Sequence, residues 1–548
     1  MKVKLFFLLL FFLVFSLFAD GYKSPAQDIA DMVDGPELPL ALPSPQGNYL
    51  ILLGYEKMPP LERLAEGHLK LAGLRLQTAD NARQRVTFIV EMQIINLRTE
   101  KKTSVKLPEG IRCGRPQWAY NEKHLAFAGR GPRGTELFVI ERKSGQVKAI
   151  PGLLLNGFFH DGFSWLHAGD DLLVFSIPNE RGPAPKPNSI PRAPAIQESG
   201  GRLAPSRTYQ DLLQNPEDEE LFSYYARTSL KVVSLATGAT ENIGPEGLLL
   251  SAEVSPDGRF ILVHRIERPF SYNVPYYLFP QKVEIWDRQG ELVHLLADLP
   301  LADGIPNRGV RTGPRQVSWR PFKPAELVWL EALDQGNPQI AVEHRDRLMS
   351  LSAPFTNEAQ ELLLFKNRCQ VLYWGRPQGR LLAVETDWST AQVTARLADI
   401  VDKRKAPLRN LYSLNIRDDY KNPGRPLLME TERGERVLLQ NGAWIYFSGI
   451  RSTPLGDRPF VDRLHLDSFN RRNLFESGKN DFETFISFVG SDRQRFVSRR
   501  ESASETPNYY LRKFNSSRRR ALTSFAAPGN VRAIKHGHPH GGIAEING

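Results

Sequence analysis

Short hydrophobic stretches recur along the whole chain, and most of them follow a turn-forming string or a tryptophan. The clearest example is Ser255-Pro256-Asp257-Gly258, which precedes the apolar run Phe260 to Val263. Pro, Asp and Gly favour tight turns, and a short apolar run after such a turn is typical of a buried strand. Eight units begin in this way, the last two more weakly, with strands at Tyr49 to Leu53, Leu125 to Ala128, Leu172 to Phe175, Phe260 to Val263, Leu327 to Leu330, Leu381 to Val384, Pro426 to Met429 and Phe485 to Phe496.

A second pattern closes the units: two alternating strands around a Gly or Asn turn. Such hairpins run from Leu137 to Ile150, Leu230 to Ile243, Val283 to Leu296 and Leu464 to Phe475. A sheet of this size cannot bury its faces alone, and radial stacking around a channel buries them while leaving only short edges. The pattern predicts an all-β fold, a β-propeller of seven or eight four-stranded blades with short helical insertions. Seven blades result if the first and last strands share one.

Two segments interrupt the repeat. Residues 178–207 are rich in Pro, Gly and Ser and lead into Tyr209 to Leu213 and Pro216 to Tyr225, which we expect to be helical, so one blade carries an excursion over 178–225. A covering loop is its plainest interpretation, and a lid or docking arm is the alternative. Leu61 to Leu71 has apolar residues at helical spacing and predicts a helix that packs onto the propeller.

The two ends of the chain differ from its body. Residues 1–19 contain Lys2 and Lys4 followed by a run of Leu and Phe, which predicts a signal peptide and an exported, periplasmic or extracellular protein. An uncleaved membrane anchor is the alternative. Residues 20–525 are assigned to the propeller, and 526–548, which contain three alternating histidines, to a disordered His/Gly tail rather than a metal site.

Charge and cysteine content narrow the functional classes. The chain has 71 Lys and Arg against 61 Asp and Glu, and eleven of these basic residues lie between Arg493 and Lys535. Such a stripe can meet nucleic acid, anionic lipid or an acidic protein, but a solvated face is the commoner case and export argues against nucleic acid. Cys113 and Cys369 are the two cysteines, expected as buried thiols with a single bridge as the alternative. No cofactor is predicted.

Several longer strings resemble a known family, the glutamyl endopeptidase branch of the prolyl oligopeptidase clan of serine peptidases. The resemblance covers roughly residues 22–525, and its strings are Met58 to Leu61, Leu71 to Arg75, Thr208 to Leu213, Glu219 to Tyr225, Arg268 to Tyr272, Val274-Pro275, Phe279-Pro280, Thr312 to Arg315, Trp329 to Asp334, Arg417 to Tyr420 and Pro423-Gly424. It implies an N-terminal propeller, followed in the family by an α/β-hydrolase domain with a Ser, Asp, His triad. The propeller channel and the interdomain cleft then restrict access to small or unfolded peptides.

The sequence departs from the family at its catalytic end. A hydrolase nucleophile needs a strained elbow, usually Gly-x-Ser-x-Gly, and the sequence contains none. The chain stops soon after Leu522 to Phe525, which resembles the strand end that precedes the hydrolase, so we expect a chain truncated before that domain, and no catalytic residue can be assigned. The leading hypothesis is a non-catalytic propeller that gates peptides for a hydrolase domain acting in trans. An exported protein-interaction scaffold is the alternative, and an enzyme with an unrecognised site is the weakest hypothesis.

Individual residues add few candidates. Arg268 and Arg315 lie in family-like strings and are predicted substrate contacts for an acidic side chain, with loop bracing as the commoner role. His160-Asp161 and His465 with Asp467 place an imidazole beside a carboxylate, but turn positions explain both pairs. The tryptophans recur at equivalent blade positions, where packing between sheets is expected; they are Trp118, Trp165, Trp319, Trp329 and Trp374.

Overall fold

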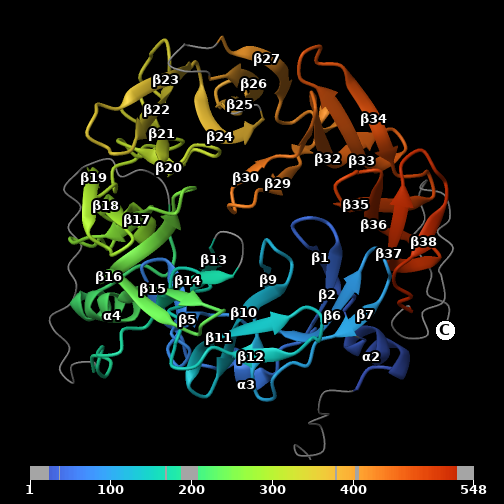
Figure 1. Ribbon diagram of the computed structural model, residues 1–548, viewed down its shortest axis with the longest axis horizontal. Helices are drawn as coiled ribbons and strands as arrows, with labels where there is room; N and C mark the ends of the chain where they lie inside the picture. Colours follow the sequence, from blue (N-terminus) through green and yellow to red (C-terminus); the bar gives the residue numbers. More distant parts are fainter. Residues whose placement is uncertain are drawn as a thin grey trace, which may run out of the picture.

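A computed structural model describes residues 24–35, 37–166, 170–186, 208–376, 379–400 and 407–526. Antiparallel sheets stand in a ring around a central opening (Figure 1). The described helices are short and lie outside the sheets: α2 (Gln27–Asp34), α3 (Leu61–Leu64), α4 (Pro216–Ala226), η2 (Tyr276–Leu278) and η3 (Asp419–Lys421). The predicted signal segment 1–19 and almost all of the predicted tail lie outside the described residues.

The described strands form eight blades, each a four-stranded meander that starts at the channel and ends at the rim. In blades 1 and 2 these strands are β1 (Leu40–Pro43), β2 (Tyr49–Tyr55), β6 (Ile89–Asn96) and β7 (Lys102–Ser104), then β8 (Arg112–Cys113) with β9 (Gln117–Trp118), β10 (His124–Gly131), β11 (Gly134–Glu141) and β12 (Val147–Ala149). In blades 3 and 4 they are β13 (Phe163–Trp165), β14 (Asp171–Ser176), β15 (Thr228–Ser234) and the long β16 (Thr240–Val254), which continues into the next blade, then β17 (Phe260–Ile266), β18 (Gln281–Asp287) and β19 (Leu292–Leu299).

The second half of the ring repeats the arrangement. Blades 5 and 6 contain β20 (Arg315–Trp319), β21 (Glu326–Ala332), β22 (Asp346–Ser352) and β23 (Gln360–Phe365), then β24 (Arg368–Gly375), β25 (Arg380–Asp387), β26 (Gln392–Asp399) and β27 (Arg409–Asn415). Blades 7 and 8 contain β28 (Arg425–Pro426) with β31 (Gln440–Asn441), β32 (Trp444–Thr453), β33 (Gly456–His465) and β34 (Arg471–Glu476), then β35 (Asp481–Val489), β36 (Arg495–Ser502), β37 (Glu505–Lys513) and β38 (Arg519–Ala521). The predicted all-β propeller is confirmed, with eight blades.

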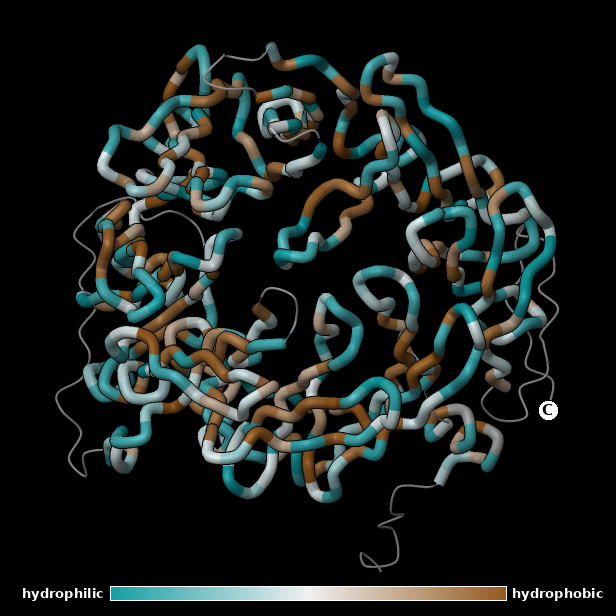
Figure 2. The backbone as a smooth tube through the Cα atoms, viewed as in Figure 1, coloured by the Kyte–Doolittle hydropathy of each residue, from teal (hydrophilic) through white to brown (hydrophobic). Residues whose placement is uncertain are grey.

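The apolar runs in the sequence become the second strand of most blades. In β2, Leu50 to Leu53 are all buried, because each side of the sheet packs against a neighbouring blade. A strand covered on both faces reads as a continuous apolar run rather than an alternating one. The tube in Figure 2 is accordingly hydrophobic along the strands and hydrophilic at many of the loops.

The meander gives the ring two different ends. Strand direction alternates, so the loops between second and third strands lie at the same end as the links between blades; we call this end the insertion face. The first-to-second and third-to-fourth turns lie at the opposite end, the turn face. Most long insertions fall on the insertion face, including 56–88, 267–280 and the described residues 178–186 and 208–226.

Three of these insertions share a core of their own. A small sheet of β3 (Leu69–Leu71), β4 (Leu74–Gln77) and β5 (Ala82–Arg83) packs beside α4 and the loop after β17. At its centre Phe222 is fully buried and its ring contacts those of Phe158, Phe270 and Phe279. The insertions therefore form an additional layer on the ring with its own hydrophobic core; we call them the satellite layer and the satellite core.

The structure corrects two predicted helices. Leu61 to Leu71 forms only the single turn α3 before the chain enters β3, and Leu61 is 82% exposed rather than packed onto the ring. The segment Tyr209 to Leu213 is not helical, and Asp211 has a positive φ of 56° there. In both places long-range partners override the local spacing, as in the hydrogen bond from the Gly73 backbone N–H to the Asp211 carbonyl. The predicted helix at Pro216 is confirmed as α4, capped by Asn215.

The ring closes without a shared blade. Blade 1 and blade 8 each consist of consecutive strands, so the two ends of the chain meet at a seam rather than in one sheet. Apolar side chains from both blades pack there, and the Tyr509 hydroxyl donates to the Pro39 carbonyl and accepts from the Ala41 N–H, at 3.0 and 3.1 Å. No described helix is long and apolar enough to cross a membrane.

Candidate functional site

The innermost strand of blade 7 is interrupted by a hairpin. Between β28 and β31 the chain leaves the sheet as β29 (Leu428–Glu430) and β30 (Arg436–Leu438), and this hairpin projects into the central opening (Figure 1). Val437 and Leu438 are buried at its base, whereas its tip is hydrophilic (Figure 2). The sequence reading of Pro426 to Met429 as the start of a blade strand is therefore wrong, because the blade resumes only at β31.

The hairpin tip reaches other blades at the turn-face end of the channel. Glu435 accepts a hydrogen bond of 2.8 Å from the Phe322 N–H of blade 5. Burial, followed by the charges of Glu432, Glu122 and Glu430, raises the pKa of Tyr120, which places the acidic side chains of the hairpin close to blade 2. These contacts come from opposite parts of the ring, so the hairpin lies across the channel.

Two cavities flank the hairpin. The larger, of about 660 Å³, lies against the inner strands of blades 3 to 6, and the smaller, of about 440 Å³, lies against blades 7, 8 and 1. Arg436 lines both cavities, which confirms that the hairpin separates them. Each has the size of an ordinary small-molecule or short-peptide site.

The larger cavity has a carboxylate in its wall. Glu253, near the end of β16, exposes its side chain to the cavity but is surrounded by protein, and this desolvation raises its pKa to about 7. Its neighbours along the wall include the neutral polar side chains Ser318, Gln316 and Gln370. The carboxylate is poised between its charged and neutral forms near pH 7.

Four of the five predicted tryptophans lie on the first strand of a blade, at the inner wall, whereas Trp329 lies on β21, a second strand, and packs between blades there. The Trp165 indole donates to the Gln117 carbonyl of the preceding blade at 3.0 Å, and Trp319 donates to the Glu253 carbonyl at 2.9 Å. Trp319 also packs among apolar side chains from blades 4 and 5. Packing between sheets is thus their described role, and the hydrogen bond from Trp319 fixes the strand that carries Glu253.

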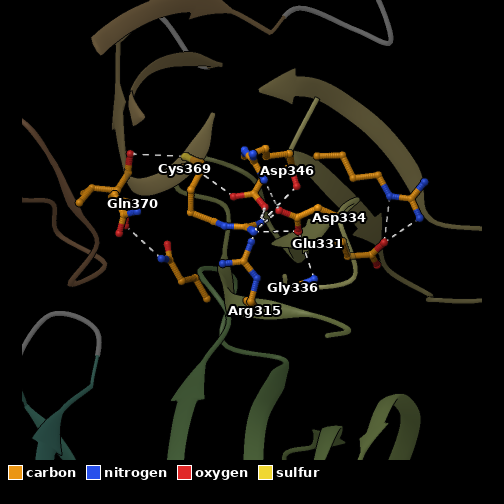
Figure 3. A network of polar contacts seen from close by, with 12 residues as sticks. Arg315, Glu331, Asp334, Gly336, Asp346, Cys369 and Gln370 are labelled. Carbon is orange, nitrogen blue, oxygen red and sulfur yellow. Dashed lines mark hydrogen bonds and ion pairs between the residues drawn. The ribbon is translucent and has the colours of Figure 1, made fainter. Parts of the chain in front are cut away.

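Arg315 belongs to a buried ion network between blades 5 and 6 (Figure 3). Its guanidinium is 11% exposed and donates to Asp346 at 2.7 Å, and Arg368 bridges Asp346 and Asp334. Burial alone would raise the pKa of Asp334, but hydrogen bonds and charge from Arg368 and Arg345 hold it below its usual value. Arg315 can therefore reach a ligand only by giving up its aspartate, and its geometry is that of a bracing residue.

Arg268 is placed differently, on the insertion face. Its guanidinium is 55% exposed, pairs with Glu219 of α4, and lies 4.4 Å from the centre of the Phe270 ring. The Tyr272 hydroxyl donates to the same Glu219 at 2.8 Å. The structure does not bring Arg268 and Arg315 into one site, because Arg268 joins the satellite layer whereas Arg315 lies between blades 5 and 6.

The histidine pairs do not form catalytic dyads. His160 accepts the Gly162 N–H in a turn, burial lowers its pKa to about 4, and Asp161 pairs with Arg85 instead. His465 likewise accepts the Asp467 N–H within its turn. Both cysteines are free buried thiols, so the alternative of a bridge is not realised, and no cluster of metal-ligating side chains occurs within the described ranges.

The basic stripe near the C-terminus is partly neutralised. Arg499, Arg500, Arg512 and Arg519 in blade 8 each pair with an acidic residue of the same blade. Arg520 pairs with Glu100 of blade 1. These contacts favour a structural role and give no support to a polyanion-binding surface.

Exposed apolar side chains gather on the insertion face. They are Met58, Leu61, Leu64, Tyr272, Tyr277, Leu333, Trp388, Ile416, Tyr420, Ile450 and Leu455. No connecting loop on the turn face carries an exposed large apolar side chain within the described part of the chain. Soluble proteins rarely expose such groups together unless the surface meets a partner.

The strings that resemble the peptidase family also lie at this end of the ring. Three of them meet at Gly73, whose φ is +90° and where a Cβ would come within 2.7 Å of the Pro275 side chain. Gly73 donates to the Asp211 carbonyl, and the Ala72 carbonyl accepts from the Tyr276 N–H. Any side chain at Gly73 would push the three strings apart, so their close packing depends on a glycine at this position.

Comparison with known proteins supports the resemblance to the glutamyl endopeptidase branch. The chain is 31% identical over 542 residues to a protein of Oryza sativa subsp. japonica described as a probable chloroplastic glutamyl endopeptidase, and 30% identical to one of Arabidopsis thaliana with the same description. The chain is similar to glutamyl endopeptidases. The alignments cover 93% of this chain but 57% and 56% of the two relatives, so the chain spans little more than half of their length. No protein-family model matches it.

Solved structures with a similar fold include a prolyl endopeptidase and a β-propeller domain. One, described by a study of two prolyl endopeptidases, has a TM-score of 0.42 at 11% identity and covers 89% of this chain and 56% of that chain. The β-propeller domain of the Trilobed protease from Pyrococcus furiosus has a TM-score of 0.36 at 10% identity, covering 76% and 99%. Likenesses this weak have no bearing on function.

Proposed function

We propose that this chain is the non-catalytic, peptide-gating propeller of an exported serine peptidase of the glutamyl endopeptidase type, and that a separate α/β-hydrolase domain supplies the catalytic groups. The observation that carries the proposal is the one-sided distribution of exposed apolar side chains, exemplified by Leu61 and Leu455, at 82% and 71% exposure. The similarity to the plant relatives supports the family, and the absence of Gly-x-Ser-x-Gly from the sequence supports a non-catalytic role.

The route of a peptide follows from the hairpin. Because β29–β30 lies across the turn-face end of the channel, peptides would reach the cavities from the insertion face, where the hydrolase would also dock. Of the two restrictions that the family resemblance implies, the propeller channel and the interdomain cleft, this proposal relies on the cleft. Access would then depend on the space between the two domains.

Arg268 is the better placed of the two predicted substrate contacts. It is exposed on the proposed docking face, and a substrate carboxylate could compete with Glu219 for its guanidinium. Export rests on the pattern of residues 1–19, and a membrane contact would need that segment to remain uncleaved.

The catalytic part of the proposal can be tested on purified residues 20–548. We expect no hydrolysis of chromogenic peptides with Glu, Asp or Pro before the scissile bond, and no labelling by a serine-reactive phosphonate. Labelling together with turnover would overturn the non-catalytic role.

The gating part needs a hydrolase. We would join residues 20–526 to the region of the rice relative that this chain does not match, and assay the same peptides. We expect turnover that is lost when Leu61→Asp and Leu455→Asp are combined but kept in Gln289→Asp, an exposed position on the turn face. An inactive chimera, or one indifferent to the insertion-face substitutions, would favour the alternative of an exported interaction scaffold that uses this face for another partner.

A further inference from the structure

The larger channel cavity is asymmetric in charge. Glu253 is the acidic residue on the side formed by the inner strands, and the hairpin tip on the other side contributes Arg433, Arg436 and Glu435. Glu435 is already engaged by the Phe322 N–H and the Thr431 hydroxyl. Among the described residues, no hydrogen bond or ion pair involves the Glu253 carboxylate, so one end of the cavity presents an unmatched acceptor.

A carboxylate in such surroundings favours a cationic ligand. Desolvation is the cause of its raised pKa, with no compensating charge from a described neighbour. A protonated amine in the cavity would restore the charged form and donate up to three hydrogen bonds. A bound metal fits less well, because no group of three potential ligands occurs within the described ranges.

We infer that the larger cavity binds a short peptide through its free amino terminus, with the ammonium at Glu253 and the rest of the peptide extending toward Arg436 of the hairpin. A volume of about 660 Å³ accommodates a few residues. Arg436 is exposed, lines the cavity and attracts the carboxyl end of such a peptide. The site lies wholly within this chain and needs no hydrolase, so it stands apart from the gating role.

Binding depends on pH in a defined direction. Glu253 must be charged, and its pKa of about 7 means that affinity rises as the pH increases from 6 to about 7.5. The other charged groups that line the cavity are Arg433, Glu435 and Arg436, and no described histidine lines it. The α-amine of the peptide has a pKa of roughly 7.7–8.0, so it loses its proton and binding falls again above about pH 7.5.

The test is calorimetric titration of purified residues 20–548 at pH 7.5 with triglycine and with N-acetyl-triglycine. We expect triglycine to bind about tenfold more tightly or better, the value of one charge-assisted hydrogen bond. Glu253→Gln should abolish the difference. Glu241→Gln, an exposed position in the rim half of the same strand, should leave it unchanged.

Two further arms make the result decisive. Nα-Acetyl-lysine amide carries an amine only on its side chain, and binding equal to that of triglycine would assign the site to basic side chains instead. Thermal unfolding of Glu253→Gln establishes that the variant is folded, and we expect no loss of stability because a desolvated charge is removed. Equal binding of the two triglycines, or no binding of either, would overturn the inference, whatever the outcome of the peptidase chimera.

Discussion

The insertion face and the turn face are the two ends of the same set of strands, yet they are built differently. On the turn face, Ser, Asp and Gly close short turns whose side chains satisfy their own backbone, as when Ser255 accepts the Phe260 N–H at 3.0 Å. On the insertion face, long loops pack into a shared aromatic core around Phe222, and a buried ion network joins blades 5 and 6. Local hydrogen bonds close the turns at one end, with single bonds between neighbouring blades such as that from the Asp257 N–H to the Pro324 carbonyl, whereas packed insertions join distant segments at the other.

The comparison suggests that the turn face mainly supports the blades, whereas the insertion face carries the surface that recognises other molecules. Short turns repeat because each blade needs them, and they expose little apolar surface. The insertion face carries the strings that resemble the peptidases and most of the exposed apolar side chains, so it is the end at which we expect evolution to have built recognition. Substitutions that separate the two ends sharpen this comparison.

The largest effect is expected from the ion network. Arg368→Ala leaves Asp334 and Asp346, both fully buried, without their shared partner, and should cost about 3–5 kcal/mol in the free energy of unfolding. The matched pair on the turn face is Arg259 with Asp257, where Arg259 is 64% exposed. Arg259→Ala should cost at most about 1 kcal/mol. Urea unfolding of both variants measures the two losses in the free energy of unfolding. Equal losses would show that ion pairs contribute equally to stability on the two faces.

The satellite core should respond next. Phe222→Leu removes ring contacts to several phenylalanines and should cost about 1–2 kcal/mol, concentrated in the insertions. Faster trypsin cleavage at Arg227 would report this local loss. Phe355→Leu, in a buried turn-face position, should weaken the ring without changing that cleavage. Unchanged cleavage in Phe222→Leu would show that the insertions do not depend on this core.

The seam between blades 1 and 8 comes third. Tyr509→Phe removes the hydroxyl that bonds to Pro39 and Ala41 and should cost about 1 kcal/mol. Tyr510→Phe is the control, because no described hydrogen bond involves its hydroxyl. The denaturant midpoints of the two variants measure this cost. An unchanged midpoint for Tyr509→Phe would show that apolar packing alone stabilises the seam.

The smallest expected effect concerns the hairpin. A thiol placed in the larger cavity by Ser318→Cys should react slowly with a bulky maleimide, and adding Glu435→Ala should speed the reaction about fivefold, the value of one lost hydrogen bond. The native thiols interfere little, because burial raises the pKa of Cys113 to about 11 and that of Cys369 well above its usual value. An unchanged rate would indicate that the hairpin does not close the channel.

Much of the ring was predictable because its signals are local. The strings at Ser44 and Ser255 become first-to-second turns, and each serine accepts the N–H five residues later. The predicted hairpins Leu137 to Ile150 and Val283 to Leu296 are also confirmed, and they turn at Ser144-Gly145 and Gln289-Gly290, between the third and fourth strands of their blades. In these places the residues that specify the turn are the residues that form it.

The features of the candidate site were not predictable, because they depend on contacts between residues that only the folded ring brings together. Asp334, Asp346 and Arg368 are distant in sequence and are brought together only when two blades stack. The turn at Thr431 to Glu435 looks like any other hairpin turn, and nothing local indicates that it leaves the sheet and enters the channel. Glu253 reads as one more polar residue of an alternating strand until the ring defines the cavity.

The unshared seam also bears on how such a ring is inherited. Since no blade borrows a described strand from the other end of the chain, the described strands of each blade come from one continuous stretch. A gene duplication or deletion spanning one of blades 5 to 8, which are separate sheets, would therefore add or remove a whole module without breaking a sheet. By the same logic, a circular permutant opened at the link between blades 5 and 6, with residues 526 and 37 joined by a flexible peptide, should preserve every strand pairing.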